Sequence, residues 1–160
     1  MKGAHLDLLV TDPTDGGSLA IELKYLTDKW EGEVDGEQFA LLRQSAQDIR
    51  GYDCVKDIAR VERLVAAGYA KAGLVLILAN DPSYWRAPTH DRVTNADAFR
   101  LHDGLTLTGP RAWGPRTGPG TSVSRTTPID LAGMYTLAWR DYSELPGTRG
   151  RFRYLAVPVT

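Results

Sequence analysis

Hydrophobic and polar residues alternate in two short runs near the start of the chain. The first run is HLDLLV, residues 5–10, and the second is LAIELKYL, residues 19–26. Side chains alternate between the two faces of a β-strand, so this period indicates two strands. Between them lies TDPTDGGS, which is rich in turn-forming residues. The pattern therefore predicts an antiparallel hairpin.

Both runs carry charged side chains. Glu22 and Lys24 share one face of the second predicted strand, and the hairpin brings Asp7 of the first strand close to Glu22. A charge within an apolar strand is costly unless it is paired, hydrated or bound to a metal. Mg²⁺ takes one or two carboxylates together with water and phosphate oxygens. We therefore interpret Asp7 and Glu22 as ligands of Mg²⁺ or Mn²⁺, with the backbone carbonyl of Leu23 as a further ligand.

This set of residues suits the hydrolysis of a phosphodiester. A bound metal ion polarises the phosphate and lowers the pKa of a coordinated water. Lys24 orients that water or stabilises the charge that develops on the phosphorane. Two alternatives stay open: Asp12 and Asp15 of the predicted turn compete with Asp7 for the first carboxylate, and a solvated surface hairpin accounts for the same pattern without chemistry. His5, on the face of Asp7, is an auxiliary candidate.

The motif of Asp7 followed by Glu22, Leu23 and Lys24 on two adjacent strands resembles the PD-(D/E)xK nuclease superfamily, which has the restriction-endonuclease-like fold. The resemblance covers residues 1–80. It implies a core of a helix, three strands, a helix and a further strand. It also implies that Asp7 and Glu22 bind the metal, that Lys24 is the catalytic lysine and that the protein acts on nucleic acid, with homodimers common among such enzymes.

Two features depart from that pattern. Leu6 stands where the name of the superfamily has a proline, and only residues 1–4 precede the first predicted strand. The helix that usually comes before this strand is therefore expected to be missing. In such folds the helix after the second strand packs beside the site, which makes Gln44 and Gln47 auxiliary candidates. The alternative for both glutamines is an ordinary solvated helix face.

The pattern changes after the hairpin. TDKWEGEVDGE is expected to be a linker, and apolar residues then recur at helical spacing between Gln38 and Ala67, which predicts one long helix. Asp57 and Arg60, three residues apart on it, are interpreted as a surface pair. The continuous apolar run LVLILAN, residues 74–80, is typical of a strand buried on both faces. Strand, helix and strand together predict a crossover connection.

The second half of the chain predicts additional strands. MYTLAWRDY and RFRYLAVPV alternate, whereas PRTGPGTSVSRTTP is a long loop rich in proline and glycine. We therefore predict one α/β domain over residues 1–160. Its mixed central β-sheet is flanked by helices, with a restriction-endonuclease-like core in residues 1–80 and a β-rich extension in residues 81–160.

The composition excludes several classes of protein. The single cysteine, Cys54, excludes an intrachain disulfide, and no run is long enough for a transmembrane helix. No signal peptide is recognised, so the cytoplasm is the expected location, without a membrane partner. The sequence predicts a metal-dependent nuclease that hydrolyses phosphodiester bonds, with DNA as the expected substrate. The alternative is a non-catalytic nucleic-acid-binding or defence-associated module that retains the nuclease fold.

Overall fold

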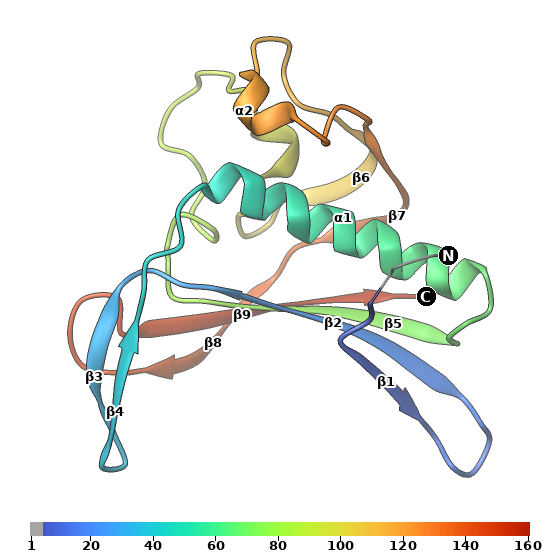
Figure 1. Cartoon of the computed structure of the whole chain (residues 1–160), viewed down its shortest axis with the longest axis horizontal. Helices are drawn as coiled ribbons and strands as arrows, with labels where there is room; N and C mark the ends of the chain where they lie inside the picture. Colours follow the sequence, from blue (N-terminus) through green and yellow to red (C-terminus); the bar gives the residue numbers. More distant parts are fainter. Residues whose placement is uncertain (1–4) are drawn as a thin grey trace.

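The computed structural model describes residues 5–160, and a five-stranded mixed sheet dominates it (Figure 1). The strand order is β1-β2-β5-β9-β8. The predicted hairpin and crossover are confirmed, because β1 and β2 pair antiparallel while β2 and β5 pair parallel. β9 pairs antiparallel with both β5 and β8. The strands are β1 (Leu8–Thr11), β2 (Ser18–Leu26), β5 (Ala72–Ala79), β8 (Trp139–Glu144) and β9 (Arg151–Val159).

The crossover helix is shorter than predicted. α1 spans Gln47–Ala66, and the predicted start at Gln38 is wrong because a second hairpin precedes the helix. β3 (Trp30–Val34) and β4 (Glu37–Leu41) pair antiparallel within the segment expected to be a linker and the start of the helix. Asp35 and Gly36 connect them with φ angles of 52° and 82°. Asp-Gly is a strong two-residue hairpin signal because this turn requires positive φ at both positions.

Only one face of the sheet is covered by a helix in the described residues. α1 crosses this face in Figure 1, and the opposite face has no helix on it. The strand β5 alternates strictly between buried and half-buried residues, so the prediction that it is buried on both faces is wrong. A run of apolar residues fits both cases, and its composition does not reveal which face a helix covers.

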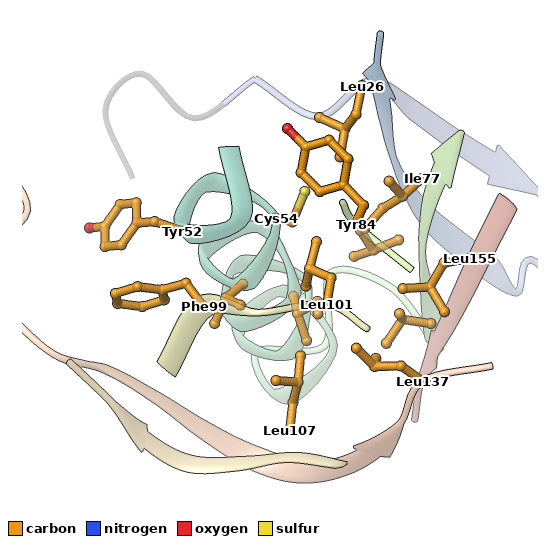
Figure 2. Packing of buried hydrophobic residues seen from close by; sticks show 14 of the residues in the cluster. Leu26, Tyr52, Cys54, Ile77, Tyr84, Phe99, Leu101, Leu107, Leu137 and Leu155 are labelled. Carbon is orange, nitrogen blue, oxygen red and sulfur yellow. The ribbon is translucent and has the colours of Figure 1, made fainter. Parts of the chain in front are cut away.

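The extension packs against the far side of α1 as well as extending the sheet. β8 and β9 join the main sheet, whereas β6 (Thr106–Arg111) and β7 (Ile129–Thr136) form a separate two-stranded sheet. The two shortest helical segments, η1 (Asp97–Phe99) and α2 (Pro119–Ser122), lie in this part. Figure 2 shows Phe99 and Leu107 beside α1 on sides of the helix that are turned away from Ile77 and Leu155, with Leu101 between the helix and these two residues. The helix is therefore enclosed between two β-structures, and this holds its position over β2.

The four residues before His5, where the resemblance implies a missing helix, lie outside the described residues. None of the helices within residues 5–160 has both the length and the apolar character needed to cross a bilayer. The described elements are consistent with a mixed α/β fold built on one sheet and one long helix.

Candidate active site

Strand β2 carries its two charged residues on the face that α1 covers. Ala20, Glu22 and Leu26 are buried and Lys24 is half-buried, whereas Leu23 is exposed. The predicted sharing of one face by Glu22 and Lys24 therefore holds. Glu22 is only 1% exposed, which is rare for a carboxyl group unless it is paired. The burial arises because α1 lies directly over this part of the strand.

Helix α1 supplies the partners of both residues. Lys24 Nζ lies 2.7 Å from Asp57 Oδ2, and Arg60 Nη2 forms an ion pair with Glu22 Oε2. Arg60 Nη2 also lies 3.1 Å from Asp57 Oδ1 and so links the two pairs. We call Glu22, Lys24, Asp57 and Arg60 the charged cluster. It joins helix and sheet through charge-assisted contacts in a region where solvent access is limited.

Asp57 and Arg60 do form the expected pair, but the prediction that it lies on the surface is wrong. Asp57 is 6% exposed because α1 faces the sheet at this position. The sequence held a signal for this burial. Cys54 and Val61, three residues before and four after Asp57, are fully buried and share its stripe of the helix. An acidic residue within a buried stripe opposite a charged strand is better interpreted as part of a site.

Asp7 lies at the edge of the charged cluster. β1 begins at Leu8, one residue later than Asp7, so the side chain is fixed by a hydrogen bond and not by the strand. The Leu23 backbone N–H donates to Asp7 Oδ2 at 2.8 Å. Leu8 pairs with Ile21, so continuing the register by one residue places Asp7 opposite Glu22. The predicted approach of these two carboxyl groups is therefore present.

The pKa values of the two carboxyl groups shift in opposite directions. The hydrogen bond from Leu23 lowers the pKa of Asp7 most, and the adjacent Glu22 carboxyl and the positive charges of Lys24 and Arg60 act in the same direction. Burial raises the pKa of Glu22 to about 7. Arg60 opposes this rise, whereas the neighbouring carboxylates of Asp57 and Asp7 add to it. Asp7 is therefore ionised at neutral pH while Glu22 is poised between its two forms.

The pKa of Lys24 reflects two opposing causes. Burial favours the neutral amine, but the hydrogen bond and negative charge of Asp57 outweigh it, and the pKa is raised. Lys24 is therefore a permanent cation near pH 7, suited to binding an anion and unsuited to accepting a proton. Its side chain is 31% exposed, so it is accessible from solvent.

The donor set can be tested against a divalent metal. Among residues 5–160, no group of three or more His, Cys, Asp or Glu side chains is arranged to hold an ion. The ligand set under test is smaller: Asp7, Glu22 and the Leu23 carbonyl. Within the described part of the chain, Glu22 Oε1 is buried without a hydrogen-bond partner. The Leu23 N–H points to Asp7, and its C=O points to the same side because the N–H and C=O of one strand residue share a direction. These oxygens suit Mg²⁺, which uses one or two carboxylates and keeps several waters.

The auxiliary candidates lie in different places. His5 lines a cavity of about 210 Å³ together with Glu22 and Arg60, so it is next to the cluster. Gln47 is the first residue of α1 and its Nε2 donates to Asp81 at 3.4 Å. Ten residues of helix, about 15 Å, separate Gln47 from Asp57. Gln44 precedes α1, and its backbone N–H donates to the Thr27 carbonyl. Neither glutamine contacts the charged cluster among the hydrogen bonds of residues 5–160.

The competing aspartates are occupied within the β1–β2 turn. Asp12 accepts hydrogen bonds from the backbone and hydroxyl of Thr14, at 2.8 and 2.6 Å. Asp15 accepts from the Gly17 N–H at 2.7 Å and pairs with Lys71 at 2.9 Å. These contacts lower the pKa of both carboxyl groups. Asp12 and Asp15 thus stabilise the turn, which leaves Asp7 as the aspartate beside Glu22.

Comparison of the chain with family models, with curated proteins and with solved structures gives no match. The identification of this site therefore depends on the geometry of residues 5–160 and on the motif in the sequence.

Proposed function

We propose that this protein is a metal-dependent phosphodiesterase that hydrolyses nucleic acid, with DNA as the expected substrate. The observation that supports the proposal most is the state of Glu22. Its carboxyl group is 1% exposed, its Oε1 has no hydrogen-bond partner among residues 5–160, and it lies opposite Asp7 and on the face of Lys24. A buried, incompletely paired carboxyl is costly to keep, and such groups concentrate at functional sites.

Asp7, Glu22 Oε1 and the Leu23 carbonyl would hold Mg²⁺ or Mn²⁺. When bound, the ion supplies a Lewis acid for the phosphate and an acidic water. Arg60 engages Glu22 Oε2, which leaves Oε1 free for the ion. The hydrogen bond from Leu23 orients Asp7 in the same way. Both carboxylates are thus positioned by contacts that do not involve the ligand, which reduces the cost of ordering them on binding.

Lys24 and Arg60 provide positive charge for the substrate. Lys24 is held against Asp57 at 2.7 Å yet is 31% exposed. Its ammonium is therefore fixed in place and accessible to a phosphate oxygen, whose charge increases in the transition state. Asp57 acts as a positioning residue because it contacts both cations and is itself buried. These roles agree with the topology around the site, in which an antiparallel hairpin is followed by a helix and a parallel strand.

A cleavage assay tests this proposal directly. The purified chain is incubated with supercoiled plasmid, linear duplex and single-stranded DNA, and with RNA, in the presence of Mg²⁺, Mn²⁺ or EDTA. We expect metal-dependent cleavage of at least one DNA substrate, abolished by EDTA and by Lys24→Ala. Cleavage that persists in both would show a contaminating nuclease. Absence of cleavage on every substrate, with the protein folded, would contradict the assignment.

One observation favours a second function, that of a non-catalytic nucleic-acid-binding or defence-associated module. Both cations of the charged cluster are already paired with carboxylates, and Asp57 engages the two of them. In that case the cluster only fastens α1 to β2. Titration calorimetry distinguishes the two, because a purely structural cluster has no need to bind Mg²⁺ or Mn²⁺, whereas the proposed site binds either ion with a measurable heat.

A further inference from the structure

Arginine is the main charged residue of the segment that packs on the far side of α1. Residues 85–128 contain six arginines and three aspartates, with neither lysine nor glutamate, which gives this segment a formal charge of +3. Figure 1 shows the yellow-green loop before η1 and the orange segment around α2 on the side of α1 that is turned away from the main sheet. The whole chain carries a net charge of −1, so the positive charge is local. Such a local surplus favours an anionic partner at this surface.

Three of these arginines have guanidinium groups that are not paired. Arg86, Arg92 and Arg116 are exposed, and none of their side chains forms an ion pair or a hydrogen bond with another residue in the described part of the chain. By contrast, Arg151 of β9 is paired with Asp141 at 2.9 Å. An unpaired guanidinium group keeps all five of its N–H donors for a ligand.

Contacts around Trp113 bring the two loops together. The Gly114 N–H donates to the Asn95 carbonyl at 2.8 Å, and the Arg116 N–H donates to Asn95 Oδ1 at 3.2 Å. A Cβ on Gly114 would lie 2.7 Å from Asn95 Cα, so this close approach of the two backbones requires glycine. Arg92, three residues before Asn95, and Arg116 therefore lie in one surface region.

Aromatic packing fixes the same loops to α1. The Trp113 ring stacks on that of Tyr52 of α1 at 5.7 Å and lies 4.6 Å from that of Phe99. The Arg125 guanidinium group lies over the Tyr52 ring, 5.9 Å from its centre. We call the following residues the arginine surface: Arg86, Arg92, Arg100, Arg116 and Arg125. Its loops are held against a long helix, which reduces the entropy cost of ordering them when a ligand binds.

A cavity of about 320 Å³ lies within the arginine surface, beside the first turn of α1. Arg86, Arg100 and His102 contribute to its lining, and Asp48 is the one carboxylate among the described residues that does so. Tyr84 also lines the cavity. It is 5% exposed, and its hydroxyl has no hydrogen-bond partner among residues 5–160. A buried hydroxyl without a partner costs free energy, which a ligand that accepts its hydrogen bond would recover. The cavity thus gives the arginine surface a recess suited to a phosphate oxygen.

The chemistry of the arginine surface favours nucleic acid over a membrane. A planar guanidinium group binds two phosphate oxygens at once, and a nucleic-acid backbone presents phosphates one after another. A membrane-binding surface also uses exposed tryptophan, phenylalanine or leucine side chains to enter the bilayer. Phe99 is 3% exposed and Trp113 is packed against Tyr52, whereas the large apolar side chains exposed in these loops are Val93 and Val123.

We propose that the arginine surface holds the phosphate backbone of the nucleic acid on either side of the bond cleaved at the charged cluster. The inference rests on the proposed function for the identity of the partner. Arg125 lies over Tyr52, eight residues of α1 before Arg60 of the charged cluster, which is about 12 Å along the helix axis. At about 3.4 Å for each phosphate of a strand, this distance corresponds to about three or four phosphates.

Binding measured in EDTA, where no metal-dependent cleavage occurs, tests this surface. Fluorescence anisotropy follows a labelled single strand and a labelled duplex at several salt concentrations. We expect Arg92→Glu and Arg116→Glu each to weaken binding by at least about fivefold, and Arg116→Ala to reduce the slope of log K against log[salt] by about 0.7–0.9, because one phosphate contact is lost. The control is Arg140→Glu. Arg140 is an equally unpaired, exposed arginine within residues 5–160, but it lies on β8, outside the arginine surface. This variant should leave the affinity unchanged.

All these variants replace exposed side chains, so each should fold, and circular dichroism verifies this. A wild-type chain that binds neither nucleic acid at about 10 µM would overturn the inference. Equal weakening by Arg140→Glu would overturn it too, as would binding to phosphatidylserine vesicles in place of nucleic acid. Binding that depends on Arg92 and Arg116, without cleavage in Mg²⁺ or Mn²⁺, would support the surface and contradict the proposed phosphodiesterase. Cleavage that depends on Lys24, with unchanged affinity in the arginine variants, would overturn the surface alone.

Discussion

The two faces of the main sheet reverse the usual distribution of charge. The face under α1 holds Glu22, Lys24 and their partners Asp57 and Arg60, with Glu22 and Asp57 almost completely buried. On the opposite face, the outward positions of β1, β2, β5 and β9 carry no charged residue, although Leu8, Leu23 and Tyr25 are more than 40% exposed, and the exposed Arg140 of β8 lies beside Tyr154. Folding alone favours the opposite arrangement, because buried charge costs free energy and exposed apolar surface gains none.

This contrast teaches that stability does not explain either face. A buried ion network is often no better for stability than well-packed apolar residues of similar volume, so stability alone is a weak explanation for the charged cluster. An exposed apolar face likewise requires a partner to become favourable. The proposed metal site would account for the charge under α1.

Substitution within the charged cluster should have the largest effect, on catalysis. We expect Lys24→Ala and Glu22→Gln to reduce the cleavage rate by about 10²–10³-fold, which is typical when one group that stabilises transition-state charge is lost. The matched control is Asp15→Asn, since Asp15 lies in the turn and contacts Lys71. Single-turnover cleavage measures the effect. Comparable loss of activity in Asp15→Asn would contradict the assignment of Asp7 as the first carboxylate.

Two neighbouring residues of β5 allow the packing on the two faces of the main sheet to be compared. Ile77 points towards α1 and is fully buried, whereas Leu76 points towards the opposite face and is half-buried. We expect Ile77→Ala to lower the free energy of unfolding by about 3–4 kcal/mol and Leu76→Ala by about 1 kcal/mol. Urea denaturation at low protein concentration measures both. Equal losses would mean that the face turned away from α1 is covered as fully as the face under α1.

Removing Asp57 tests how far the cluster depends on one residue. Asp57→Ala leaves Lys24 and Arg60 without their shared carboxylate, and we expect a loss of about 2–3 kcal/mol. The value is below that of a fully buried pair because the two cations are 31% and 25% exposed. Asp141→Ala breaks pairs with Arg151 and Arg153 in which the Asp141 carboxylate itself is 62% exposed, whereas Asp57 is 8% exposed, so it should cost less than about 1 kcal/mol. Similar losses of unfolding free energy in the two variants would mean that the charged cluster is as well solvated as an ion pair on the surface.

The sequence predicted the parts of this arrangement that depend on local pattern. The first hairpin, the parallel crossover and the shared face of Glu22 and Lys24 follow from strand period and turn residues. The boundary of α1 was missed because the Asp35-Gly36 turn was interpreted as a linker, although the two residues are a hairpin signal. A competing pattern of helical spacing outweighed that signal.

Other features depend on which elements meet in space, and local pattern does not carry that information. The pairing of Lys24 with Asp57 joins residues 33 positions apart, and it follows only when α1 is known to lie over β2. The lack, within residues 5–160, of a helix over the face of β5 that is turned away from α1 is of the same kind. An apolar strand has the same composition whether its second face is covered by a helix or by a second chain.

The raised pKa of Glu22 should make the stability of the fold depend on pH. Its pKa is raised from an ordinary 4.5 to about 7, so the folded protein binds more protons than the unfolded one between these values. The contribution to stability is complete below about pH 4.5 and is lost as the pH rises through 7. We expect about 2 kcal/mol to be lost over this window, and Glu22→Gln to remove that pH dependence. Denaturation curves at pH 5 and 8 measure the difference. An identical pH dependence in the variant and the wild type would mean that Glu22 has an ordinary pKa.

Metal binding should depend on pH in the opposite direction, and its effect on stability should be the smallest of those expected here. An ion on Glu22 Oε1 competes with the proton there, so binding should tighten as the pH rises through about 7 and release protons below it. At ten times the dissociation constant, Mg²⁺ should stabilise the fold by about 1.4 kcal/mol. Thermal unfolding should therefore show a larger Mg²⁺-induced shift in Tm at pH 8 than at pH 6, and none in Glu22→Gln. Ca²⁺, which accepts oxygen ligands in a more flexible geometry than Mg²⁺, is the control ion in the same unfolding measurement. An Mg²⁺ shift that is the same at both pH values, or that persists in Glu22→Gln, would move the ion elsewhere and leave the charged cluster as a fastening between helix and sheet.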